Sequence, residues 1–121
     1  MLWNIIGCSA IGLVFYLSLL SHPPDVVSFQ FADKINHIFA YSMLMGWFVQ
    51  LYSSRQNQVI LAIAFCLMGL LLEVLQGMGG HRFFEYTDMA ANVIGVFLGW
   101  WLSQNWCAGW LYRVDQVLSR Q

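Results

Sequence analysis

The sequence predicts an all-α integral membrane protein, a compact bundle of four transmembrane helices followed by a C-terminal amphipathic helix. Of its 121 residues, 60% are hydrophobic and 9% are charged, whereas about half of a soluble domain is apolar. Four apolar segments, at about 2–20, 34–52, 58–78 and 88–106, approach the roughly 20 residues that a helix needs to cross a bilayer. The connections are short, so we expect antiparallel neighbours within one domain spanning residues 1–121.

The first segment could also be a cleaved export signal. It lacks a basic stretch at its start and a small-residue cleavage motif before Pro23. We therefore expect a retained first helix, which ends at Ser21-His22-Pro23-Pro24 because proline disfavours helical backbone there. The following ten or so residues alternate apolar and polar side chains, a pattern typical of an extended segment.

Polar and glycine residues mark the ends of the other helices. Asp33 is predicted to cap the second helix, and Thr87 or Asp88 the fourth, because their side-chain oxygens can accept from free backbone amides. The stretch Gly77-Met78-Gly79-Gly80 supplies residues that can adopt left-handed backbone angles. The third helix is therefore predicted to end there.

The C-terminal tail has an apolar helical face made of Trp110, Leu111, Val114, Val117 and Leu118. This pattern predicts an amphipathic helix on the membrane surface. Arg55, Arg113 and Arg120 lie on one side of the predicted membrane, whereas Lys34 and Arg82 lie on the other. The excess of positive charge predicts that both termini are cytoplasmic.

Most of the polar side chains gather at the opposite, extracytoplasmic face. They are Asp33, Lys34, His37, Glu73, Gln76, Arg82, Glu85, Asp88 and Asn92. With a rise of about 1.5 Å per residue, His37 lies about 6 Å inside Asp33, and Glu73 about one turn inside the end of its helix. A charge facing lipid costs several kcal/mol, so we expect these groups to share a polar pocket.

Simpler interpretations exist for several of these residues. Asp33 and Asp88 could act only as helix caps, and Lys34 and Arg82 could extend to the membrane surface. Glu85 and His81 could be solvated loop residues, and His37 could be a hydrogen-bonded packing residue. Glu73 is harder to explain in this way, because a carboxylate at this depth requires a partner such as Lys34, His37 or Arg82. Further along the fourth helix, Gly95 and Gly99 form a GxxxG step that favours close approach of another helix.

The ordered set of motifs resembles the VanZ-like family of small bacterial membrane proteins. The motifs are Asp33-Lys34-x-x-His37-x-x-x-Tyr41, Glu73-x-x-Gln76, Arg82, and Asp88-x-x-x-Asn92-x-x-Gly95-x-x-x-Gly99. The resemblance covers about residues 33–99 and implies a multi-pass inner-membrane protein with these polar residues as its signature. The founding member of the family is associated with resistance to the glycopeptide teicoplanin. The resemblance therefore implies a site but no particular reaction.

We expect an outward-facing pocket that binds an amphiphilic envelope lipid, a lipid-linked glycan precursor or a glycopeptide antibiotic. The expected contacts to this partner are Asp33, Lys34, Tyr41, Gln76, Arg82 and Asn92. An alternative is a membrane-embedded enzyme acting on an anionic envelope lipid, with His37, Glu73 and Asp88 as its acid and base groups. A second alternative is a small transporter that uses an intramembrane carboxylate.

Other partners are not expected. The formal net charge of −1 gives no basic surface for nucleic acid. A divalent cation between His37, Glu73, His81 and Asp88 was considered, but the sequence has no HExxH motif or paired cysteines. Lys34 and Arg82 would also neutralise the acidic groups, so we expect no metal and no other cofactor. The oligomeric state stays open.

Overall fold

A computed structural model describes residues 2–20, 31–80 and 83–119, and in these ranges the chain forms five α-helices and no strand. The helices are α1 (Leu2–Leu19), α2 (Ala32–Leu51), α3 (Arg55–Met78), α4 (Tyr86–Asn105) and α5 (Trp110–Leu118). The all-α class is confirmed. Helix α3 begins earlier than the predicted residue 58, because Arg55, Gln56 and Asn57 form its first turn instead of a polar loop. The predicted extended segment lies almost entirely outside the described residues.

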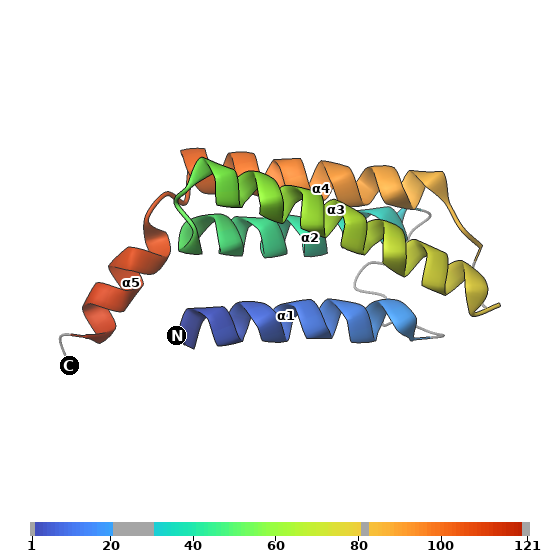
Figure 1. Cartoon of the computed structure of the whole chain (residues 1–121), viewed down its shortest axis with the longest axis horizontal. Helices are drawn as coiled ribbons and strands as arrows, with labels where there is room; N and C mark the ends of the chain where they lie inside the picture. The colour runs from blue at the N-terminus through green and yellow to red at the C-terminus, as the bar shows by residue number, and fades with distance from the viewer. Residues whose placement is uncertain (1, 21–30, 81–82, 120–121) are drawn as a thin grey trace.

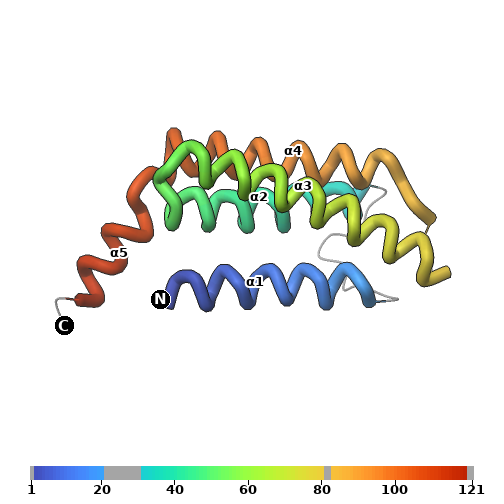
Figure 2. Tube along the Cα trace, in the orientation of Figure 1, coloured from blue at the N-terminus to red at the C-terminus, as the bar shows by residue number. Residues whose placement is uncertain are grey.

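Helices α2, α3 and α4 lie side by side, and α1 runs along one side of this group (Figure 1). The same arrangement is seen along the Cα trace, where α5 turns away from the bundle at the end where α1 begins (Figure 2). The contact between α2 and α4 is by far the most extensive. These two helices therefore hold their first turns, which carry most of the predicted site, in a fixed relation.

Glycines on α4 make this close contact possible. A Cβ atom at Gly95 would lie 2.7 Å from the carbonyl oxygen of Ile38, and one at Gly99 would overlap the carbonyl group of Ser42. The Ser42 hydroxyl also donates to the Gly95 carbonyl oxygen at 3.0 Å. The GxxxG prediction is confirmed, and the helix that approaches is α2.

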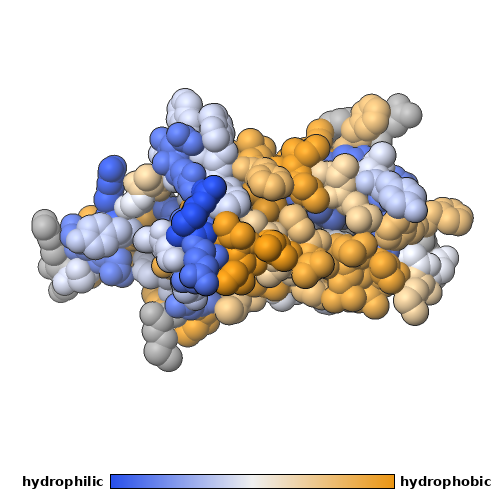
Figure 3. All heavy atoms as spheres, turned by 45° about the horizontal axis from the view of Figure 1, so that its top comes forward, coloured by the Kyte–Doolittle hydropathy of each residue, from blue (hydrophilic) through white to orange (hydrophobic). Residues whose placement is uncertain are grey.

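Length and composition qualify α1 and α3 for crossing a membrane, whereas α2 and α4 do not meet the same criteria. The predicted four-span bundle is thus supported for two of its helices. The polar residues at the starts of α2 and α4 lower the mean hydropathy of those helices. Even so, large apolar side chains such as Phe39, Met43, Ile94 and Phe97 are exposed along them. In the space-filling view, hydrophobic surface covers the middle of the bundle and hydrophilic residues gather toward the α5 end (Figure 3).

The predictions for the N-caps were wrong. The N-cap residues are Phe31 for α2 and Glu85 for α4, and neither side chain makes a capping hydrogen bond. Asp33 and Asp88 instead lie within the first helical turns, where Asp33 faces His37 of its own helix and Asp88 faces Lys34 of α2. The predicted end of α3 is confirmed, because the helix stops at Met78 and Gly80 has a φ of 73°.

Helix α5 packs partly against the bundle. Of its predicted apolar face, Leu111 is buried, whereas Trp110, Val117 and Leu118 are exposed. The backbone amide of Leu111 donates to Gln50 Oε1 on α2 at 3.1 Å. The amphipathic helix is therefore fixed to the end of α2, with apolar side chains left over for another surface.

Candidate polar site at the starts of α2 and α4

Lys34 connects α2 to α4 through two carboxylates. Its ammonium nitrogen lies 2.7 Å from Asp88 Oδ1 and 2.6 Å from Glu85 Oε2. The Asp88 side chain is only 2% exposed, whereas that of Glu85 is 50% exposed. Burying a carboxylate is costly unless a positive charge and hydrogen bonds compensate it. Lys34 supplies this compensation for Asp88, and the pair with Glu85 extends the network to the surface.

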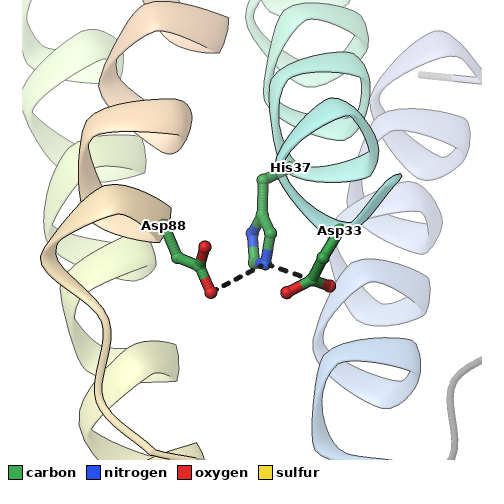
Figure 4. Close-up of side chains that lie close together, drawn as sticks. All are labelled: Asp33, His37 and Asp88. Atoms are coloured by element: carbon green, nitrogen blue, oxygen red, sulfur yellow. Dashed lines mark ion pairs between the residues drawn. The ribbon is translucent and has the colours of Figure 1, made fainter. Parts of the chain in front are cut away.

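His37 lies one turn deeper, between two carboxylates. Figure 4 shows its imidazole between Asp33, on the same helix, and Asp88, at the start of α4. Its Nε2 atom is 3.9 Å from Asp33 Oδ1 and 4.0 Å from Asp88 Oδ2. Its Nδ1 atom is 2.8 Å from Asn92 Oδ1. Because Asn92 is buried, this hydrogen bond fixes the plane of the imidazole ring.

Glu73 joins the site through the backbone rather than through a direct ion pair with Lys34. Its Oε1 atom accepts from the Glu85 backbone amide at 2.9 Å, and its side chain is buried. Glu73 thereby ties α3 to the residue that precedes α4. Gln76 has a different role, since its Nε2 atom donates to the carbonyl oxygen of Ser18 near the end of α1 at 2.6 Å.

The predicted site residues therefore fall into separate groups. The structure brings Asp33, Lys34, His37, Asp88 and Asn92 into one cluster, with Glu73 linked through Glu85. Tyr41 lies instead in the apolar core, 2% exposed, and its hydroxyl has no hydrogen-bond partner among the described residues. Arg82 and His81 lie outside the described residues.

Sequence reasoning undervalued Glu85, which it treated as a solvated loop residue. In the structure Glu85 contacts Lys34, binds Glu73 through its backbone amide, and accepts from the Thr87 hydroxyl at 3.2 Å. Its position three residues before Asp88 was the available signal, because that spacing puts two side chains near each other at a helix start.

A second polar network lies at the other end of the bundle and contrasts with the first. Gln58 Oε1 accepts from Trp100 Nε1 at 2.9 Å and from Gln104 Nε2 at 3.0 Å. Gln58 Nε2 donates to the Tyr52 carbonyl oxygen at 3.1 Å. The buried amide of Gln58 is thus hydrogen-bonded at both of its polar atoms, which is what a purely structural role requires.

Among the described residues, the site at the starts of α2 and α4 combines several carboxylates with a lysine and a histidine. The described residues contribute the carboxylates of Asp33, Glu73, Glu85 and Asp88, against one ammonium group, that of Lys34. Carboxylates can accept hydrogen bonds or bind a cation, and a histidine held between them can move protons near neutral pH. Exposed aromatic side chains lie close to these residues in the sequence, including Phe31, Phe83 and Tyr86.

The comparisons with known proteins agree with the motif order. The model of the VanZ/LLP1 family matches residues 3–107, which includes α1 except Leu2, all of α2 to α4, and every residue of the site. No curated protein and no solved structure gives a significant match. The family match confirms the resemblance seen in the sequence: the chain belongs to the VanZ/LLP1 family.

Proposed function

We propose that this VanZ/LLP1 protein crosses the bacterial inner membrane four times and binds the head group of an amphiphilic envelope compound at the outer face. Family membership and two helices that are long and apolar enough support the membrane location. The exposed apolar side chains of α2 and α4 favour lipid contact for these helices as well. The distribution of arginine supports an orientation with both termini in the cytoplasm.

This topology is tested by reporter fusions. A fluorescent protein fused after Gln121 is expected to fluoresce, and alkaline phosphatase fused there is expected to be inactive, because the latter folds only outside the cytoplasm. The same reporters inserted between Gly79 and Gly80 lie at the end of the bundle that carries Lys34 and Asp88. They should give the reverse result. Active phosphatase at the C-terminus would contradict the proposed orientation.

The observation that carries the binding proposal is the ion-pair network of Lys34. It begins at Asp88, which is 2% exposed, and ends at Glu85, whose side chain is 50% exposed. A network of this kind presents fixed polar atoms to a ligand at the surface, beside exposed aromatic residues such as Phe83 and Tyr86. Aromatic side chains are favoured where lipid meets water, so the neighbourhood suits a compound with a polar head and an apolar chain.

The charges favour a glycan head group. Lys34 already contacts two carboxylates, so a phosphate would have to displace one of them to bind it. Hydroxyl and amide groups of a sugar can instead donate to the carboxylate oxygens without displacing Lys34. Among the envelope compounds expected from the sequence, we therefore propose a lipid-linked glycan precursor; an anionic lipid and a glycopeptide are the competing outcomes.

Native mass spectrometry of the purified protein tests this proposal. We expect a bound species with the mass of a lipid-linked glycan. Glu85→Gln should lower its affinity about tenfold, because a charged acceptor is lost at the rim. The matched control is Asp115→Asn, which removes an exposed carboxylate on α5. Equal retention by both variants, or binding of phospholipid or glycopeptide alone, would refute the glycan proposal.

A second candidate function is catalysis on the bound head group. It is favoured by His37, whose ring is oriented by Asn92 and lies between two carboxylates. A histidine held in this way can act as a general base or acid. The purified protein would then convert a lipid-linked glycan into a product of different mass, and His37→Gln would abolish conversion while leaving binding. Recovery of unchanged ligand after incubation with the wild-type protein would contradict catalysis.

A further inference from the structure

Arg55 carries a positive charge at a fixed position where α3 begins. Its guanidinium carbon lies over the indole ring of Trp100 on α4, 4.5 Å from the ring centre. The indole is itself held in place, because its Nε1 atom donates to Oε1 of the buried Gln58 at 2.9 Å. The ring of Phe97 lies nearly parallel to it, at an interplanar angle of 16°. A cation–π contact orients a guanidinium without neutralising it, so the full charge of Arg55 is available to a ligand.

This charge has no acidic partner in the part of the chain that the structure describes. Arg55 is exposed and forms no ion pair there, and Asp115 on α5 accepts instead from Trp3 Nε1 at 3.1 Å. The first turn of α3 contains no acidic residue, so the positive end of the helix dipole adds to the charge. A guanidinium that stacks by its face keeps its edge N–H groups free, and these match two oxygens of a phosphate.

Apolar side chains lead from Arg55 toward the middle of the bundle. Val59 and Ile63 follow it by about one and two turns along α3, and Phe97 precedes Trp100 by about one turn on α4. Val59, Ile63 and Phe97 are all exposed. Helix α3 begins at the end where α5 turns away (Figure 1), and hydrophobic surface covers the middle of the bundle beyond it (Figure 3). Acyl chains attached to a phosphate at Arg55 have an apolar surface to lie on, whereas inorganic phosphate makes no use of it.

We propose that Arg55, oriented by Trp100, binds the phosphate of an anionic phospholipid. A zwitterionic head group is disfavoured because its ammonium would add a second positive charge beside Arg55, and Asp115 already accepts from Trp3. The site lies at the opposite end of the bundle from Lys34 and does not depend on glycan binding. Only its assignment to the cytoplasmic leaflet rests on the proposed topology.

Lipid titration followed by native mass spectrometry tests the proposal. Protein in detergent is titrated with phosphatidylglycerol or with phosphatidylcholine of the same chain length. Wild type should bind the first phosphatidylglycerol about tenfold more tightly, and Arg55→Gln should abolish this preference. Arg55→Lys should recover part of it, because lysine keeps the charge but not the planar stacking. The matched control is Arg113→Gln, which removes another exposed arginine at this end and should change the affinity by less than about twofold.

Several results would overturn the proposal. They are equal phosphatidylglycerol affinities in wild type and Arg55→Gln, and an equal loss in Arg113→Gln, which would indicate attraction by net charge alone. Displacement of the lipid by inorganic phosphate would assign the site to free phosphate instead. Substitution of the exposed Arg55 spares the core, and equal binding of both lipids by wild type would refute the proposal without any variant. Glycan binding should be unchanged in Arg55→Gln, so either proposal can fail while the other holds.

Discussion

Replacing Gly99 with alanine perturbs the contact that holds α2 against α4. The added Cβ atom would overlap the backbone carbonyl group of Ser42. Backbone cannot rotate away as a flexible side chain can, so the two helices must separate locally. Gly95 lies one turn earlier on the same face, and its Cβ would meet the Ile38 carbonyl oxygen at 2.7 Å. Separation at Gly99 would therefore weaken the packing along much of the shared surface.

The size of the effect follows from two opposing contributions. Overpacking of a tight contact costs typically 1–3 kcal/mol, and the backbone clash at Gly99 belongs at the upper end of this range. Alanine stabilises a helix interior by about 1 kcal/mol relative to glycine. We expect a net loss of about 2 kcal/mol in the free energy of unfolding for Gly99→Ala. Gly12→Ala, where a Cβ meets nothing within 4 Å, should instead gain up to about 1 kcal/mol.

Thermal or denaturant unfolding in detergent micelles, followed by helical circular dichroism, measures both changes. Gly46→Ala provides an intermediate case, because its Cβ would lie at an ordinary 3.5 Å from the Gly99 carbonyl oxygen. The expected order of stability is Gly12→Ala, then Gly46→Ala, then Gly99→Ala. If Gly99→Ala were as stable as Gly12→Ala, the close packing of α2 on α4 would be refuted.

Two further predictions concern single side chains of the site and the core. Lys34→Met removes the ammonium group beside Asp88, which is 2% exposed, and should cost about 3–5 kcal/mol of unfolding free energy. Glu85→Gln alters the half-exposed partner and should cost no more than about 1 kcal/mol; equal effects in the same unfolding assay would argue against the buried pair. Tyr41→Phe removes a buried hydroxyl that has no partner among the described residues and should stabilise the protein by about 1 kcal/mol. A clear destabilisation would mean that this hydroxyl has a partner in solution.

Periodicity and composition were sufficient to predict the helices and the convergence of their polar ends. The argument from depth in the membrane worked for Lys34, His37, Asp88 and Asn92 because α2 and α4 are adjacent and run in the same direction. Their first turns therefore lie side by side at one end of the bundle. The GxxxG step predicted the close contact from the residue types alone. Only glycine leaves room for a carbonyl group of another helix at that distance.

Other features depend on which helix lies beside which, and sequence patterns do not contain that information. Gln76 was grouped with Glu73 by its spacing, yet it binds the carbonyl oxygen of Ser18 because α1 ends beside it. Asp33 and Asp88 were predicted as caps, but the ammonium of Lys34 and the imidazole of His37 offer stronger partners than backbone amides. Glu85 was counted among the polar residues of this face but not among the expected contacts, because a loop glutamate is usually solvated.

Photo-crosslinking in intact membranes tests most directly the claim that the end carrying Lys34 and Asp88 binds a head group. Tyr86 and Trp106 are aromatic and equally exposed, at 79% and 78%, and they lie at opposite ends of α4. A photoreactive residue at position 86 should capture a glycan-bearing lipid, whereas the same residue at position 106 should not. Capture at position 106 alone, or equal capture at both positions, would contradict the account.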